Sequence, residues 1–129
     1  MKEHIPGEII RKQMAIVDEQ TEERLDQLLQ SFLKDFKERN LQENGWPKNL
    51  SAYTASKVAV STYTRILAEK YPTSCINCVR PGFAKTDINF NTGIVSVEEG
   101  AKGPVMLALL PGGIPTGLFY EQTNPSTFE

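Results

Sequence analysis

The alternation of apolar and polar residues is most regular in the first third of this 129-residue chain. From Thr21 onward, apolar residues recur every three or four positions and charged residues fall on the opposite face. Thr21 has a side chain suited to an N-cap, and Glu22 and Glu23 stand where the helix dipole favours negative charge. The pattern predicts an amphipathic helix over about 21–39. Its apolar stripe consists of Leu25, Leu28, Leu29, Phe32, Leu33 and Phe36.

The segments on either side of this helix are less regular. Residues 1–20 show no sustained period and predict an irregular chain with a short helical turn at Ile9–Met14. After the helix, the run N-G-W-P is typical of turns and loops. A second helix is predicted over about 51–71, and Pro72 marks its end. Many residues of this helix are small, which lets either another helix or a ligand approach it closely.

The second half of the chain alternates apolar runs with a third helix. Residues 75–80 (CINCVR) form a near-continuous apolar run, as found in strands that are buried on both faces of a parallel sheet. Ser96 and Glu99 make a capping box for a helix that runs to about Leu110. Pro104 lies inside this helix and is expected to kink it or to split off its first turn.

A last short strand, over about 117–121, brings the predicted strands to two. Helices that alternate with apolar strands indicate a parallel α/β sheet. Two strands are too few for such a sheet, because they leave unpaired edges on a chain of this size. We therefore expect that the strands which belong beside these two lie outside this sequence.

Composition and charge narrow the function classes. The chain has 14 basic and 16 acidic residues, so its net charge of −2 gives no basic stripe for DNA or RNA. It contains no apolar run of about 18 residues, which a membrane span requires. Its N-terminus, MKEHIPGEII, carries charges and a proline where a signal peptide has a long apolar core. We expect a cytoplasmic protein that binds neither nucleic acid nor membranes.

The two cysteines, Cys75 and Cys78, form a C-x-x-C pattern. A redox site would require this pattern at a turn or a helix N-terminus, and a zinc site would require a second ligand pair. The pattern lies instead in the apolar run CINCVR, where positions three apart point to opposite faces of a strand. We predict two buried strand cysteines and no metal site. A redox protein is the least favoured alternative.

One pair of residues has the spacing of a catalytic group. Tyr53 and Lys57 are four residues apart in the second predicted helix, so their side chains lie on one face. A free tyrosine ionises only near pH ~10, and a nearby ammonium favours the phenolate by charge attraction. A phenol tuned in this way can give a proton to a developing alkoxide, which is the chemistry of carbonyl reduction. Taken alone, the pair is better explained as two helical neighbours.

The sequence around the pair favours a catalytic role over two helical neighbours. The run SAYTASKVAV at 51–60 resembles the active-site helix of the short-chain dehydrogenases/reductases. The strand at 76–80, followed by PGFAKT at 81–86, is similar to that family's strand ending in P-G-x-x-x-T. The resemblance implies an α/β fold: the C-terminal half of a Rossmann-type, doubly wound parallel sheet. It also implies an NAD(P)-dependent oxidoreductase that reduces a ketone or aldehyde to an alcohol, or the reverse.

The resemblance assigns roles to single residues. Tyr53 protonates the carbonyl oxygen, while Lys57 tunes that phenol and binds the nicotinamide ribose. Ligands of such sheets bind at the carboxyl ends of the strands. The nicotinamide is accordingly expected to lie against five residues after the strand, namely Pro81, Gly82, Phe83, Ala84 and Thr86. Ala84 stands where the family more often has valine or isoleucine, a change that a backbone contact tolerates.

From Thr21 onward, the sequence resembles one branch of the family, the plant carbonyl reductases of the salutaridine, menthone and neomenthol reductase type. That branch carries an insertion before the tyrosine that folds as a helical flap over the substrate. Within a single domain, about 1–50 would form the flap, and 51–129 the catalytic helix, the Pro-Gly strand and the C-terminal helix and strand. The branch further implies a monomer, NADP(H) rather than NAD(H), and a small hydrophobic carbonyl or alcohol substrate.

Other parts of the family pattern do not occur in these 129 residues. The sequence contains no T-G-x-x-x-G-x-G turn to hold a pyrophosphate, no N-A-G segment and no catalytic asparagine. No serine precedes Ser31, which lies inside the first predicted helix. We therefore expect this chain alone to have no appreciable reductase activity. The alternative is a non-catalytic remnant that binds a partner through its unpaired strand edge and the stripe Leu25–Phe36.

Overall fold

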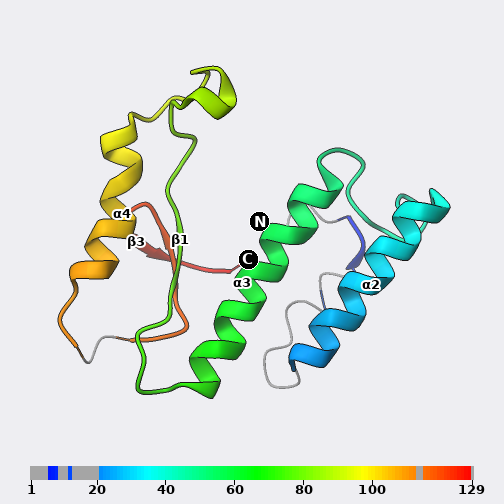
Figure 1. Ribbon diagram of the computed structural model, residues 1–129, viewed down its shortest axis with the longest axis horizontal. Coiled ribbons are helices and arrows are strands. Elements are labelled where there is room, and N and C mark those ends of the chain that lie inside the picture. The colour runs from blue at the N-terminus through cyan, green and yellow to red at the C-terminus, as the bar shows by residue number, and fades with distance from the viewer. Residues whose placement is uncertain (1–5, 9–11, 13–20, 113–114, 129) are drawn as a thin grey trace. The chain divides into compact units, whose positions relative to one another are not determined.

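A computed structural model describes residues 6–8, 12, 21–112 and 115–128 of the chain (Figure 1). The chain divides into two compact units, one of residues Met1–Leu67 with Phe128–Glu129 and one of residues Ala68–Thr127. Most of the irregular segment predicted for 1–20, including the turn at Ile9–Met14, lies outside the described residues. No helix in the described part of the chain is long and apolar enough to cross a membrane.

The first predicted helix is confirmed almost to the residue as α2 (Glu22–Glu38). The hydroxyl of Thr21 accepts a hydrogen bond from the Arg24 N–H at 3.3 Å, and the helix ends where Arg39 turns into the left-handed region with φ 62°. The buried stripe is narrower than predicted. Leu25 and Phe32 are buried, whereas Leu33 and Phe36 are 45% and 56% exposed.

The second predicted helix is α3 (Ser51–Lys70), and its small residues admit another helix rather than a ligand. Figure 1 shows α2 and α3 lying side by side. Two buried clusters join the two helices. One consists of Phe32, Trp46, Ala55 and Val58, and the other of Leu25, Ala59 and Ile66. The first half of the predicted stripe is thus used inside the first unit and is not free to bind a partner.

The loop between α2 and α3 is fixed to α2 by one carboxylate. Asp35 accepts a hydrogen bond from the Trp46 indole N–H and another from the Asn44 amide, both at 2.8 Å. Trp46 is only 2% exposed, and its ring packs edge-on against Phe32 with 4.9 Å between the centroids. The N-G-W-P run, which ends the helical pattern, therefore also contributes the Trp46 side chain to the core.

Replacing Asp35 by alanine should lower the stability of the first unit by about 1–3 kcal/mol, because the substitution leaves the buried indole N–H of Trp46 without an acceptor. Urea unfolding followed by far-UV circular dichroism would measure the change. Asp26→Ala removes an exposed carboxylate from the same helix and should change stability by no more than about 0.5 kcal/mol. Equal effects of the two substitutions would contradict the role of Asp35.

The second unit contains a three-stranded sheet in the order β1-β2-β3. β1 (Cys78–Arg80) and β2 (Phe119–Glu121) are parallel, with Cys78 opposite Phe119. Both strands are shorter than the predicted 75–80 and 117–121. A third strand, β3 (Asn124–Ser126), was not predicted; it pairs antiparallel with β2 after a tight turn in which Gln122 has φ 56°.

Helix α4 (Val97–Leu109) connects β1 to β2 and lies against the sheet. The Ser96 hydroxyl caps it as predicted by accepting a hydrogen bond from the Glu99 N–H at 3.1 Å. The helix runs unbroken through Pro104, so the first turn is not split off. It approaches the sheet closely, since a Cβ on Gly103 would come within 2.2 Å of the Gln122 carbonyl oxygen. The β1-α4-β2 order is part of the predicted α/β fold.

The prediction of two buried strand cysteines was wrong. Cys75 is exposed and Cys78 is only half-buried, and neither forms a disulfide. The strand begins at Cys78, so Cys75 belongs to the connection before it, and the described chain supplies no layer to cover it. No group of three or more potential metal ligands occurs among the described residues.

Candidate active site

Tyr53 and Lys57 lie on one face of α3, as their spacing predicts. The Lys57 Nζ atom is 5.7 Å from the centroid of the Tyr53 ring, a distance at which the ammonium is attracted to the ring. Tyr53 is 60% exposed, as is Val60 two turns further along the same face. This face is opposite the one that packs on α2, which carries Ala55 and Ala59. The pair therefore stands on the open side of the helix.

The helix backbone below the pair is held by short local bonds. The Ser56 hydroxyl donates to the Tyr53 carbonyl oxygen at 2.8 Å, and the Ser61 hydroxyl donates to the Lys57 carbonyl oxygen at 3.1 Å. The helix starts abruptly after Leu50, which has φ 50°. An oxygen atom on the open side would have the exposed Tyr53 side chain available to it, with the Lys57 ammonium near the ring. The arrangement can thus deliver a proton to such an oxygen.

The Pro-Gly segment follows the carboxyl end of β1 in the second unit. Gly82 has φ +90°, a conformation that favours glycine, and it turns the chain away from the strand. The next residues pair with a later segment: Ala84 forms a parallel bridge with Val95, and the Lys85 N–H donates to the Val95 carbonyl at 2.8 Å. Gly93 lies so close that a Cβ there would be 2.3 Å from the carbonyl carbon of Ala84. The segment is therefore tightly shaped, while Phe83 stays 52% exposed.

The structure adds one residue to the predicted site that the sequence did not single out. The side-chain oxygen of Asn89 accepts from the Thr86 N–H at 3.1 Å, and its amide nitrogen donates to the Ala84 carbonyl at 2.7 Å. Asn89 lies in η2 (Asp87–Asn89), a single turn of 3-10 helix that starts just after Thr86. Its signal in the sequence is the spacing T-x-x-N, in which the amide can return to the start of the turn.

The predicted site residues fall into two groups. Tyr53 and Lys57 belong to the first unit and are brought together on α3. The other five belong to the second unit and lie on one segment after β1; they are Pro81, Gly82, Phe83, Ala84 and Thr86.

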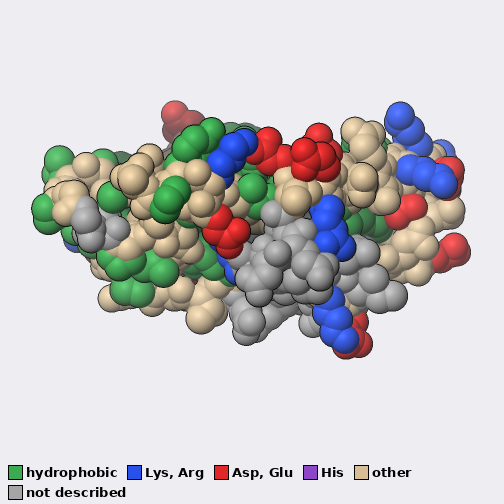
Figure 2. All heavy atoms as spheres, turned by 90° about the horizontal axis from the view of Figure 1, so that it is seen from below, with side chains coloured by type: hydrophobic (Ala, Val, Ile, Leu, Met, Phe, Trp, Pro, Cys, Tyr) green, Lys and Arg blue, Asp and Glu red, His purple; other side chains and the backbone are tan. Residues whose placement is uncertain are grey.

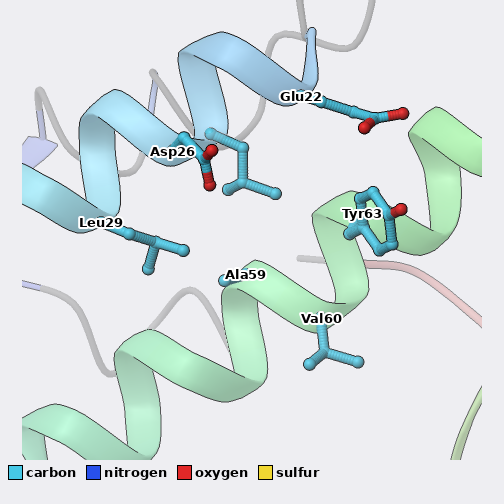
Figure 3. Close-up of a pocket in the computed structure, with 7 residues that line it drawn as sticks. Glu22, Asp26, Leu29, Ala59, Val60 and Tyr63 are labelled. Atoms are coloured by element: carbon cyan, nitrogen blue, oxygen red, sulfur yellow. The ribbon is translucent and has the colours of Figure 1, made fainter.

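An open groove of about 360 Å³ lies between α2 and α3 in the first unit (Figure 3). It is lined by Glu22, Leu25, Asp26, Leu29, Ala59, Val60 and Tyr63. In Figure 3, Glu22 on α2 and Tyr63 on α3 lie at the same end of the groove. Tyr53 and Lys57 are not among its lining residues, and its floor is formed by the packing of α2 on α3. The groove thus does not contain the pair, although Val60 at its edge lies on the same side of α3 as the pair.

Figure 2 shows acidic and basic side chains interspersed on one face of the molecule. This distribution agrees with the net charge of −2. The visible face therefore has no stripe of one sign.

Comparison with known proteins shows which family the chain belongs to. No family model matches the chain. Short-chain dehydrogenase/reductase 1 of Saponaria officinalis is 54% identical over 125 residues, which are 97% of this chain and 41% of that protein. The (+)-neomenthol dehydrogenase of Arabidopsis thaliana is 51% identical over 109 residues, 84% of this chain and 37% of that protein. The chain belongs to the short-chain dehydrogenase/reductase family.

Solved structures of the family agree with the fold. The structure of salutaridine reductase from Papaver somniferum matches with a TM-score of 0.88 and 42% identity, covering 93% of this chain and 41% of that one. Menthone neomenthol reductase from Mentha piperita matches with a TM-score of 0.75 and 38% identity, covering 91% of this chain and 35% of that one. The predicted family, its plant branch and the incomplete Rossmann-type α/β fold are confirmed.

The match is confined to part of each relative. The chain spans about two fifths of the length of these two curated short-chain dehydrogenases/reductases, at their C-terminal end. The relatives thus combine the fold seen here with a longer stretch of polypeptide that precedes it.

Proposed function

We propose that this chain is the C-terminal, catalytic part of an NAD(P)-dependent carbonyl reductase. The observation that supports this proposal most is the position of Tyr53 and Lys57 on the open face of α3, with the Lys57 ammonium 5.7 Å from the Tyr53 ring. The relatives are oxidoreductases by name, among them a neomenthol dehydrogenase and an isopiperitenone reductase. The pair on α3 and the names of the relatives therefore both support carbonyl reduction as the proposed reaction.

In the proposed reaction, Tyr53 acts as the proton donor. A reduced nicotinamide, when bound, would be the source of the hydride for the carbonyl carbon. As negative charge develops on the carbonyl oxygen, the Tyr53 hydroxyl gives its proton to that oxygen, and the phenolate that remains is stabilised by the Lys57 ammonium. Reprotonation of the phenol from solvent completes one turnover, and alcohol oxidation is the same sequence in reverse.

The residues of this chain fit the nicotinamide end of the cofactor and not its pyrophosphate. Gly82, at φ +90°, turns the backbone after β1, and the side chains of Gln122 and Val95 fill the space beside it. The residues that would lie against the nicotinamide are Pro81, Gly82, Phe83, Ala84 and Thr86. Asn89 would act as a positioning residue that holds this path. The glycines that could serve a pyrophosphate are otherwise engaged, since Gly100 and Gly103 are buried against the sheet and the Pro-Gly segment. NADP(H) rather than NAD(H) is proposed from the family branch.

The remaining features of the proposal also come from the branch. We propose a small hydrophobic carbonyl or alcohol substrate, a monomer and a cytoplasmic location, with about 1–50 as the flap and 51–129 as the catalytic part of a single domain. Because α2 packs on the face of α3 away from Tyr53, we place any contact of the flap with substrate in the rest of that segment.

A covalent chimera tests the proposal. The part of salutaridine reductase that this chain does not cover is fused to the chain in place of its own C-terminal part, and NADPH oxidation is followed with salutaridine as substrate. Restored turnover is expected, because 42% of the aligned residues are identical and the backbones superpose with a TM-score of 0.88. The unfused salutaridine reductase part serves as the control. A folded chimera that binds NADPH but has no turnover would refute the proposal.

By itself, the 129-residue chain should show no turnover with NADPH and cyclic ketones above the rate without protein. The reason is physical: the sequence contains no glycine-rich turn at a helix N-terminus to hold the pyrophosphate. Steady-state absorbance assays over a range of NADPH concentrations measure this. Clear turnover that Tyr53→Phe abolishes would overturn the prediction.

A non-catalytic interaction protein is the second candidate. One observation favours it: β1 has a neighbouring strand on one side only among the described residues. The stripe Leu25–Phe36 supports it less than its sequence suggests, because only Leu33 and Phe36 remain substantially exposed. Size-exclusion chromatography with light scattering separates the cases, since an interaction protein gives a defined complex and a fragment gives aggregates.

A further inference from the structure

A second groove lies in the first unit, where α2 ends and the loop to α3 begins. Its volume is about 690 Å³, which is typical of a site for one small molecule. We call it the basic groove, because its lining combines three apolar residues with three basic ones: Phe36, Leu41 and Pro47 with Lys37, Arg39 and Lys48. Tyr53 and Lys57 do not line it.

The apolar side of the basic groove is fixed by the core beneath it. Pro47 is buried, and Leu41 packs against the cluster that contains Phe32 and Trp46. The centroid of the Phe36 ring lies 6.2 Å from that of Phe32, and 56% of the Phe36 surface remains exposed. A surface that is fixed before binding loses little conformational entropy when a ligand covers it.

The basic side of the groove is not neutralised by the protein. Among the residues that the structure describes, none of Lys37, Arg39 and Lys48 forms an ion pair. The Asp35 carboxylate, two residues before Lys37, accepts hydrogen bonds from neutral side chains of the loop instead. One lining residue is acidic, Glu43. Three basic residues and one acidic residue leave the groove with a net charge of +2, in a chain whose net charge is −2.

The end of α2 does not account for these cations. The N–H groups of Arg39 and Asn40 donate to carbonyl groups of its last turns, at 3.3 and 2.9 Å. The helix dipole favours a cation in the last turn, which explains Lys37 but not Lys48 in the loop. Arg39 has φ 62°, a conformation that normally takes glycine or asparagine. A long cation therefore occupies a position that the backbone does not favour.

We propose that the basic groove binds one organic anion made of a carboxylate and an apolar body. The planar guanidinium of Arg39 matches a carboxylate, and the two lysines add attraction. The apolar body lies on the fixed apolar side of the groove. Both parts are needed, because a small anion alone gains only weak surface ion pairs. The binding does not depend on the proposed function, since it involves neither the cofactor nor Tyr53.

The test is equilibrium dialysis of the full 129-residue chain against radiolabelled decanoate, below the concentration at which it forms micelles. We expect one saturable site per chain. Acetate, which lacks the body, and decyltrimethylammonium, which carries the opposite charge, should not displace decanoate. Binding should weaken when the ionic strength rises from about 0.01 M to about 0.15 M, because the Debye length falls from about 30 Å to about 8 Å. Absence of a saturable site, or displacement by decyltrimethylammonium, would overturn the proposal.

One substitution separates binding from stability. Arg39→Gly should weaken decanoate binding by at least about threefold. The same change should leave the free energy of unfolding equal or higher, because glycine adopts φ 62° without strain. Lys34→Gln removes a cation from α2 outside the groove and should leave the affinity unchanged. Unchanged affinity in Arg39→Gly, or equal weakening in Lys34→Gln, would refute the groove as the site.

Two more variants test the two sides of the groove. Neutralising all three cations with Lys37→Gln, Arg39→Gly and Lys48→Gln should weaken binding by at least about tenfold. Phe36→Ala removes apolar surface and should also weaken it, whereas Leu33→Ala, on the same helix but outside the groove, should not. The covalent chimera contains the same groove and provides a second sample in which these differences must recur. Circular dichroism checks that each variant folds.

A lipid surface is the competing source of negative charge beside apolar groups. Sedimentation with vesicles of phosphatidylserine and phosphatidylcholine distinguishes it from a soluble ligand. Sedimentation of the chain that the triple variant abolishes would show that the cations face a membrane, and would overturn the choice of a soluble anion. A chain that binds decanoate and stays in solution beside the vesicles would support the proposal.

Discussion

Tyr53→Phe in the active chimera should lower the turnover number by about 10²- to 10⁴-fold, the usual contribution of a positioned general acid. The substitution removes only the hydroxyl, so the ring keeps its place beside the Lys57 ammonium at 5.7 Å. KM for the ketone should change little, because the lost interaction acts mainly in the transition state. Initial rates over a range of ketone concentrations, at saturating NADPH, give both constants.

The chain contains a closely matched control for this substitution. Tyr71 is also an exposed tyrosine next to a lysine, with the Lys70 Nζ atom 5.8 Å from its ring centroid and 48% of its surface exposed. It directly follows the last residue of α3 and lies outside the family motif, so Tyr71→Phe should leave the turnover number unchanged. A similar loss in both variants would mean that exposed phenols matter for folding rather than for proton transfer.

Trp46→Ala should destabilise the first unit by about 3–5 kcal/mol, the largest effect expected of any single substitution on stability. Trp46 is 2% exposed, contacts the Phe32 ring and joins the loop to the cluster that holds α2 on α3. Its removal leaves a cavity and also deprives Asp35 of a donor. The free energy of unfolding is measured with urea and far-UV circular dichroism, because Trp46 is the only tryptophan and its fluorescence is lost.

Trp46→Phe separates the two contributions to this loss. It keeps an aromatic ring next to Phe32 but removes the N–H that donates to Asp35 at 2.8 Å. It should cost clearly less than the alanine variant. A loss below about 1 kcal/mol for Trp46→Ala would show that the loop does not anchor the two helices, since truncation of a packed aromatic residue normally costs several times more.

Local features of the sequence were enough for the helices. The three- and four-residue spacing of Leu25 to Phe32 and the caps at Thr21 and Ser96 depend on neighbours within one or two turns, and all are found in the structure. The family followed from the order and spacing of two motifs, around Tyr53 and Pro81, and the relatives confirm it. The roles of these residues in catalysis remain predictions for the experiments above.

The strands were harder to predict. The apolar run that begins at Cys75 indicates a strand, but how much of it becomes one depends on how many backbone groups find partners in a distant segment. Only Cys78–Arg80 pairs with β2, so Cys75 is left outside. β3 is polar, contains Pro125 and has no apolar alternation, so its sequence gives no strand signal. It forms because the tight turn at Gln122 brings it back onto β2.

The sequence by itself determined the helices, the spacing that puts Tyr53 beside Lys57, and the family to which the two motifs belong, because each depends on residues close together along the chain. The tertiary structure decided which surfaces are used and which are left open. It showed that α2 covers the face of α3 away from the pair, and that Asn89 shapes the segment after β1. It also showed that, among the described residues, β1 has a neighbouring strand on one side only, and that Pro125 lies in the strand at the other edge. These features depend on contacts between distant segments, which no local pattern specifies.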